Sequence, residues 1–248
     1  MRSGLYSSQQ EISRPGTLSR VAKLGLKRAA QAALVLGAGL GWIRMAGSGQ
    51  GAPSLDAAGW AALGSSTALA LFAWALAQSI PGPPGQLLQL PRPRRPLPTW
   101  GLALAVAGML GLSLAVGELL TRTGLLAGGP LERLNHLLAG ATEAQLLGAM
   151  LSMALAPAFA EELLFRGLLL GRFCKRLGTL SGLLLSSALF ALIHGEPGQA
   201  LAAFPLGLYL GALTLRTGSV HTAILCHAVN NLAAIAAAAR AHGAMVGP

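Results

Sequence analysis

Charged residues are scarce in this chain, and their scarcity decides its class. Only 10% of the 248 residues are Asp, Glu, Lys or Arg, whereas a soluble domain carries about 25%. Hydrophobic residues make up 53%, and the mean hydropathy is +0.59. So few charges cannot coat a soluble globule, and the apolar residues are grouped in long runs. These properties exclude an ordinary cytosolic enzyme and an intrinsically disordered chain.

Cysteine and aromatic residues are also few. The two cysteines, Cys174 and Cys226, match no metal-ligand spacing and form no disulfide framework. Aromatic residues make up 5% of the chain, and they do not alternate with the basic residues as a base-stacking platform requires. Although the net charge is +10, the sequence therefore predicts no nucleic-acid partner. The partner that it does predict is the lipid bilayer.

The apolar runs predict an all-α fold, a polytopic transmembrane helical bundle of about seven spans within a range of six to eight. The expected spans are 29–46, 57–80, 99–120, 143–171, 179–194, 199–215 and 219–239. The first is the shortest and carries Gln31, so a cleaved signal peptide is the alternative there. Residues 81–98 hold seven of the 14 prolines and are expected to be non-helical, and 123–142 is expected to lie at the membrane interface.

The basic residues predict the orientation. With the N-terminus in the cytoplasm, 14 of the 18 Lys and Arg residues fall on cytoplasmic segments and 4 on the outside, as the positive-inside rule requires. The excess of Arg over Lys, together with much Ala, Gly and Leu, favours a GC-rich bacterial genome. We therefore expect a multi-pass protein of the bacterial inner membrane with a cytoplasmic N-terminus.

Four regions follow from these patterns. Residues 1–28 form a basic cytoplasmic tail, and 29–142 contain the N-terminal membrane helices, the proline-rich loop and the interfacial segment. Residues 143–240 form the expected catalytic membrane core, and 241–248 a short tail.

The helix expected at 143–171 carries three charged residues, Glu161, Glu162 and Arg166. A charge near the bilayer centre costs roughly 2.5–3.5 kcal/mol even on the lenient insertion scale, so these side chains must face a protein interior or a wet cavity. Glu162 and Arg166 are four residues apart and can pair on one helix face. Glu161 lies about 100° around the helix and keeps no such partner, so it is the better candidate for a general base. The alternative is a charge pair near the headgroups.

Two later spans add histidines in the same spacing. Phe190 and His194 are four residues apart, as are His227 and Asn231. At 1.5 Å per residue, Glu161 lies roughly 15 Å, His227 roughly 12 Å and His194 roughly 21 Å from the cytoplasmic ends of their helices. Alone, each histidine would be read as a packing residue. All three groups fall in the middle layer of the bilayer, so they predict an intramembrane active site.

The order and spacing of Glu161-Glu162-x-x-x-Arg166, Phe190-x-x-x-His194 and His227-x-x-x-Asn231 resemble the CAAX protease and bacteriocin-processing family of intramembrane endopeptidases, also called Abi and similar to type 2 CAAX prenyl proteases. The resemblance covers about residues 143–240. It implies a helical membrane fold around a conical, water-accessible cavity. It also implies cleavage of a peptide bond near the C-terminus or leader of a membrane-associated substrate.

Carried over by position, Glu161 activates water with the help of His194, while His227 and Asn231 bind the oxyanion. Glu162, Arg166 and Phe190 support the site. The family is described both as metal-dependent and as glutamate-driven, so the cofactor is either none or one divalent metal ion such as zinc. Glu161, His194 and His227 would be the metal ligands, although no His-Glu-x-x-His motif is present. The sequence slightly favours glutamate-activated water.

Two other function classes remain open at this stage. A non-catalytic scaffold would bind a membrane peptide in the same cavity. A proton-coupled transporter would use Glu161 and the histidines as a relay, but it would usually show repeat symmetry, which this sequence lacks. Because every motif position is occupied by its expected residue, an intramembrane endopeptidase is the favoured interpretation.

Overall fold

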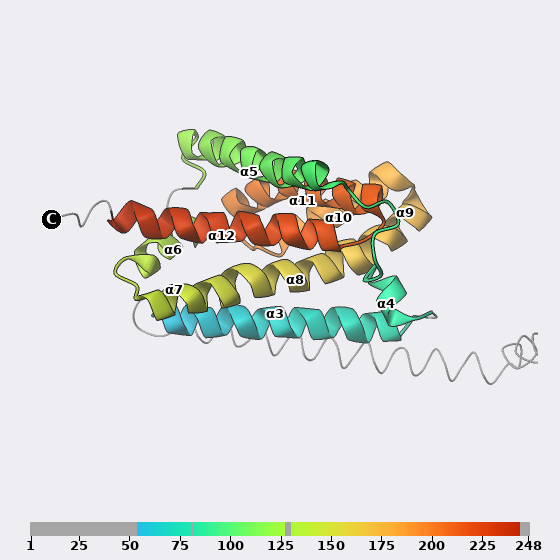
Figure 1. The fold of residues 1–248 in the computed structure, drawn as a ribbon, viewed down its shortest axis with the longest axis horizontal. Coiled ribbons are helices and arrows are strands. Elements are labelled where there is room, and N and C mark those ends of the chain that lie inside the picture. Colours follow the sequence, from blue (N-terminus) through green and yellow to red (C-terminus); the bar gives the residue numbers. More distant parts are fainter. Residues whose placement is uncertain (1–53, 81, 127–129, 244–248) are drawn as a thin grey trace, which may run out of the picture.

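The structure is a computed structural model that describes residues 54–80, 82–126 and 130–243. In these ranges the regular elements are helices, and the long ones run side by side in a bundle (Figure 1). Five are long and apolar enough to cross a membrane: Leu55–Gln78 (α3), Thr99–Arg122 (α5), Glu143–Leu177 (α7 to α9), Pro197–Thr217 (α11) and His221–Arg240 of α12 (His221–Gly243). The predicted helical membrane bundle is confirmed. The expected span 29–46 lies outside the described residues, so the total of seven stays a prediction.

One expected span is shorter than the others. Helix α10 covers Thr179–Leu192, only 14 residues, which is roughly 21 Å of helix. A full crossing needs about 30 Å. Helix α10 therefore ends inside the thickness of the bundle, and its last turn lies beside the middle of its neighbours rather than at their ends.

Two short helices lie in the connecting segments. Residues Pro130–Leu138 form α6 inside the expected interfacial segment. The expectation that the proline-rich loop is wholly non-helical was wrong for four residues, because Pro84–Leu87 form one helical turn, α4. Pro84 stands at the first helical position, where the missing N–H costs nothing and the fixed φ suits a helix.

The helix that carries the two glutamates is continuous but not uniform. It begins with a capping box in which Thr142 and Gln145 satisfy each other's backbone N–H groups. Its consecutive parts are α7 (Glu143–Ala149), η1 (Met150–Leu155), α8 (Ala156–Glu162), η2 (Leu163–Leu170) and α9 (Gly171–Leu177), and η1 and η2 are π-helical. π-Helical turns are rare in proteins, and those that occur are often found at functional sites. Glu161 and Glu162 are the last residues of the α-helical turn between them.

The connections after this helix are tight turns. Gly178, Gly195 and Gly218 all adopt positive φ, between 72° and 85°, a region that residues with a Cβ rarely enter. These turns reverse the chain after α9, α10 and α11. The helices from α8 to α12 are thus adjacent, and the residues of the three motifs come from neighbouring elements.

The proline-rich loop packs against the glutamate helix and the turn between α11 and α12. Leu88 is fully buried with Leu163 and Val220, and the Gln89 amide donates to the backbone carbonyls of Arg166 and Gly167 at 2.9 and 3.3 Å. A Cβ on Gly167 would lie 2.5 Å from the Leu88 carbonyl oxygen. Glycine at this position therefore allows the loop to support the helix next to Arg166.

Substituting Gly167→Ala should destabilise the fold by about 1–3 kcal/mol, because the added methyl group forces the loop away from the helix. The matched control is Gly111→Ala in α5, where a Cβ would meet nothing within 4 Å and helix propensity improves. Thermal unfolding in detergent checks both variants. Equal melting temperatures for the two would contradict the close approach at Gly167.

Candidate active site

A buried ion pair stands at the centre of the bundle. Arg166 Nη1 donates to Glu162 Oε1 at 2.9 Å, and the two side chains are 1% and 0% exposed. This is the i, i+4 pair that the sequence predicts. Two opposite charges removed from water together can offset each other, provided that their remaining hydrogen-bonding atoms are also satisfied.

The guanidinium of Arg166 also contacts residues of α10 and α11. Its Nη2 donates to the Gly207 carbonyl oxygen at 3.2 Å, and its guanidinium lies 4.0 Å over the ring of Phe190, a cation–π arrangement. A Cβ on Gly207 would lie 3.3 Å from Nη2 and 3.1 Å from the Phe190 ring. The absence of a side chain at Gly207 therefore gives the guanidinium its room.

Glu162 also fixes His227. Its Oε1 lies 3.0 Å from His227 Nδ1. Because an ionised carboxylate only accepts hydrogen bonds, Nδ1 must carry the hydrogen and donate it. The Nε2 atom of His227 then points to Glu161, whose Oε2 is 3.9 Å away. Glu162 is thus a support that orients the imidazole, as well as the partner of Arg166.

Glu161 stands apart from this pairing. Its side chain is 16% exposed, and its Oε2 accepts no hydrogen bond from the described residues. Glu162 Oε2 likewise has no hydrogen-bond partner among the described residues. The two glutamates differ instead in exposure, 16% against 0%, and in the Arg166 partner of Glu162, as their angular separation on the helix predicts. The Glu161 carboxylate is held beside an imidazole with an oxygen still available.

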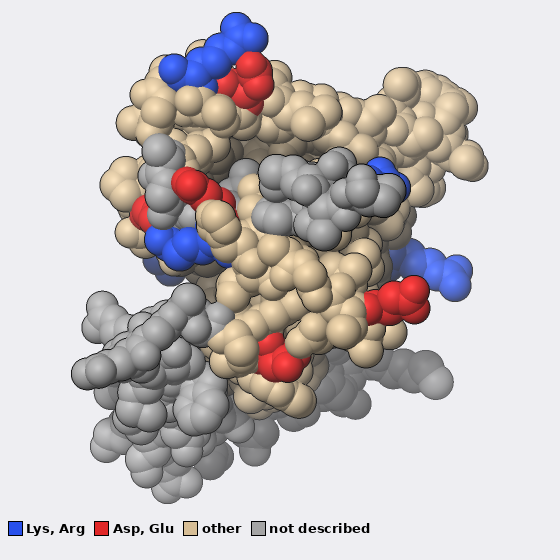
Figure 2. All heavy atoms as spheres, turned by 90° about the vertical axis from the view of Figure 1, so that its left-hand side faces the viewer, with Lys and Arg blue, Asp and Glu red and all other residues tan. Residues whose placement is uncertain are grey.

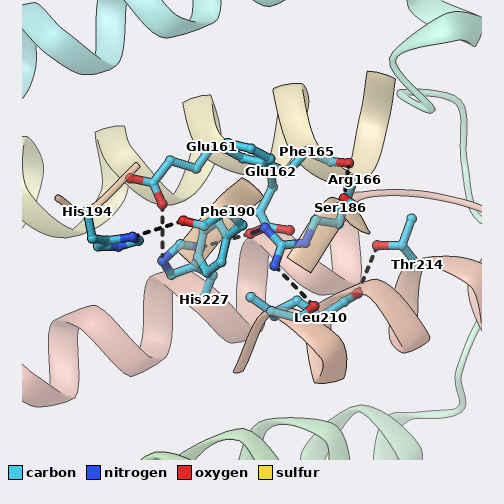
Figure 3. A network of polar contacts seen from close by, with 11 residues as sticks. Glu161, Glu162, Phe165, Arg166, Ser186, Phe190, His194, Leu210, Thr214 and His227 are labelled. Atoms are coloured by element: carbon cyan, nitrogen blue, oxygen red, sulfur yellow. Dashed lines mark hydrogen bonds and ion pairs between the residues drawn. The ribbon is translucent and has the colours of Figure 1, made fainter. Parts of the chain in front are cut away.

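His194 is oriented by the end of its own helix. Its Nδ1 lies 3.0 Å from the Phe190 carbonyl oxygen, so Nδ1 carries the hydrogen and Nε2 is left as an acceptor. Figure 3 shows Glu161, His194 and His227 gathered around Phe190. Helix α10 ends two residues before His194, and this short length brings the imidazole to the level of Glu161.

Phe190 packs against most of these groups. Its ring meets His194 and His227 edge to face, with centroids 5.3 and 5.8 Å apart. On its far side it meets Phe165 in the same way at 5.5 Å. Edge-to-face contacts of this kind favour one orientation of each ring, so Phe190 sets the spacing between the two imidazoles.

The site faces a cavity of about 450 Å³. Glu161, His194, His227 and Asn231 all line it, so the four residues expected to be catalytic share one space. Glu162 and Arg166 are not among its lining residues and lie behind it. The motif spacing on three helices thus predicted a real convergence in space.

Three polar lining residues were not expected from the sequence: Ser113, Gln199 and Asn230. Asn230 precedes Asn231, and the doubled asparagine was the available signal for it. Gln199 lies one turn into α11, and a polar residue near the start of an apolar span was a weaker signal. Ser113 lies on α5, outside the region of the family resemblance, and carries no signal at all.

The expected metal ligands are not gathered as a metal centre. Among the residues that the structure describes, no group of three or more His, Cys, Asp or Glu side chains is arranged to hold a metal ion. Glu161 and His227 are neighbours at 3.9 Å, but His194 does not complete a set with them.

Comparison with known proteins finds one family. Residues 143–233 match the family model described as Rce1-like, type II CAAX prenyl endopeptidase. The matched range begins at the capped start of the glutamate helix and ends two residues after Asn231. No curated protein and no solved structure matches the chain.

Substituting Arg166→Met should cost about 3–5 kcal/mol of stability, because it leaves the Glu162 carboxylate buried without its partner. The double variant Glu162→Gln with Arg166→Met should recover much of that loss, since it removes both charges and keeps an acceptor for His227. Unfolding in detergent measures this double-mutant cycle. If the two losses simply add, the ion pair is not coupled as the geometry indicates.

Proposed function

We propose that this multi-pass membrane protein is a CAAX-type intramembrane protease that cleaves peptide bonds with Glu161 as general base, and the match of residues 143–233 to the Rce1-like family model supports this. The observation that carries the proposal is the shared cavity. Glu161, His194, His227 and Asn231 converge there from three separate helices, in an otherwise apolar bundle where unpaired polar groups are expensive.

The reaction begins with water held between Glu161 and His194. The Glu161 carboxylate takes one proton from the water, and Nε2 of His194 accepts a hydrogen bond from the water's other hydrogen. The water oxygen then attacks the carbonyl carbon of the substrate peptide bond. A general base positioned in this way contributes about 10²–10⁴-fold to the rate.

The tetrahedral oxyanion is bound by the side-chain amide of Asn231 and by Nε2–H of His227. For Nε2 to donate, His227 must be an imidazolium, since its Nδ1 hydrogen is already given to Glu162. Protonated Glu161 then gives its proton to the departing amide nitrogen, and the C–N bond breaks. The products are a carboxylic acid and an amine, and Glu161 is again ionised.

The substrate is a membrane-associated protein or peptide with an uncharged segment around the cleaved bond. Among the residues that the structure describes, Glu161 is the one Asp, Glu, Lys or Arg side chain that lines the cavity, so a charged residue next to the cleaved bond would be desolvated without a partner. Gln199 and Asn230 offer amide groups to the substrate backbone. We place the protein in the inner membrane of a bacterium, where leader peptides and C-terminal sorting signals fit this description.

Substituting Glu161→Gln should lower cleavage of the natural substrate by about 10²–10⁴-fold, because it keeps the shape of the side chain and removes the base. Glu143→Gln, at the exposed start of the same helix, is the matched control and should cleave normally. Immunoblotting of substrate processing in cells that express each variant measures the effect. Normal processing by Glu161→Gln would reject the catalytic role and favour the peptide-binding scaffold.

Substituting Asn231→Ala should lower kcat by about 10²–10³-fold with little change in KM, as expected for a donor that acts on the transition state. Kinetics with a purified substrate separate the two parameters. A rise in KM alone would mean that Asn231 only binds substrate.

Metal analysis of the purified protein tests whether the mechanism depends on a metal ion. We propose that activation of water depends on the Glu161 carboxylate. Near-stoichiometric zinc that is lost in both Glu161→Gln and His194→Ala would instead make the enzyme a metallopeptidase with these residues as ligands.

A further inference from the structure

The cavity leads toward one end of the bundle. On α12 its lining residues run from His227 to Ile235, and on α11 from Leu210 back to Gln199. Both runs proceed toward the end where α6 lies (Figure 1), and Leu134 of α6 itself lines the cavity. We call this end of the bundle the α6 end.

Packed side chains close the cavity in the opposite direction. Below the Glu162–Arg166 pair, Leu168 belongs to one buried cluster with Leu88 and Val220, and each of these three residues is at most 1% exposed. Beside it, Cys226 packs with Met109 in a second buried cluster. A peptide therefore has no route to Glu161 through this part of the structure.

The closed end of the bundle is strongly basic. The Arg95 N–H donates to the Thr217 carbonyl oxygen at 3.2 Å, and Arg94 lies against Gly218, so the proline-rich loop and the α11–α12 turn share this end with α9. We call it the basic end. Its seven basic residues are Arg92, Arg94, Arg95, Arg172, Lys175, Arg176 and Arg216. Among the described residues, this end carries no Asp or Glu.

The α6 end has the opposite balance. Figure 2 views it directly, with acidic side chains spread over the surface. Arg133 reaches from α6 to Glu196 in the turn after α10, at 3.2 Å, and Arg122 pairs with Glu118 at 2.7 Å. The described charged residues there are Asp56, Glu118, Glu132, Glu143 and Glu196 against Arg122, Arg133 and Arg240.

We propose that the protease acts from the extracytoplasmic side of its membrane. Short loops rich in Lys and Arg stay in the cytoplasm, so the basic end is cytoplasmic and the α6 end, to which the cavity leads, is not. The inference rests on the proposed function only in treating the bound polypeptide as a substrate that is cleaved. The direction of the cavity and the charge asymmetry do not depend on that function. The inference also does not depend on the expected span 29–46.

The sidedness narrows the substrate class. The cleaved bond must belong to a polypeptide that is exposed outside the cytoplasm or anchored in the outer part of the bilayer. A translocated leader or the extracytoplasmic end of a membrane segment meets this condition. A lipid-modified tail on a cytoplasmic protein does not, since it would face the basic end and the packed clusters behind it.

Labelling of single cysteines tests the proposal in the full chain. The background is Cys174→Ser with Cys226→Ala, and three positions are then tested one at a time: Gln199→Cys in the cavity, Glu118→Cys on the surface of the α6 end, and Lys175→Cys on the surface of the basic end. A maleimide that cannot cross membranes is added to intact bacterial spheroplasts or after lysis. Monodispersity in detergent identifies any variant that misfolds.

We expect Gln199→Cys and Glu118→Cys to be labelled in intact spheroplasts, and Lys175→Cys only after lysis. The reverse pattern would overturn the orientation. Labelling of Glu118→Cys but not of Gln199→Cys in intact spheroplasts would overturn the access route. Because labelling needs no cleavage, adding Glu161→Gln should leave the pattern unchanged, so failure of the proposed function and failure of the sidedness are read separately.

Discussion

The buried pair of Glu162 and Arg166 is the constraint on which the rest of the site depends. Neither charge is tolerable alone in this apolar interior, so each is held by several neighbours. Glu162 binds Arg166 and His227 at 2.9 and 3.0 Å, and Arg166 continues to Gly207 and the ring of Phe190. These contacts join the glutamate helix to α10, α11 and α12. Satisfying one ion pair therefore also determines where both imidazoles lie.

Two adjacent glutamates with different tasks follow from helical geometry. A step of one residue turns a side chain by about 100°, so Glu162 can be enclosed while Glu161 borders the cavity. The supporting carboxylate orients His227, and His227 in turn presents its second nitrogen to Glu161. The same peptide segment thus supplies both the carboxylate that borders the cavity and the carboxylate that orients His227. The π-helical segments η1 and η2 flank α8, the short α-helical segment that carries both glutamates.

Much of this arrangement is readable from the sequence because helical spacing is a local property. The i, i+4 pairing of Glu162 with Arg166 needs only the helix repeat, and so does the placement of His194 and His227 near the level of Glu161. Contacts across the fold are different. The approach of Gly207 to Arg166 and the position of Gln199 in the cavity depend on how α11 packs against its neighbours. The residue pattern of a single helix does not predict that packing. The helical turn at Pro84 was missed because a proline that ends one helix can equally begin another.

The shortness of α10 has a consequence for the lipid around the protein. Its 14 residues span roughly 21 Å, roughly 9 Å less than the hydrocarbon core of a typical bilayer. Leu180 and Leu192, near its two ends, are 70% and 67% exposed, so the helix stands at the perimeter of the bundle. Lipid beside it must thin to match, as membranes do around short hydrophobic segments. Helix α10 ends two residues before His194, so under the proposed function hydrolysis takes place beside the helix that covers the least of the bilayer's thickness.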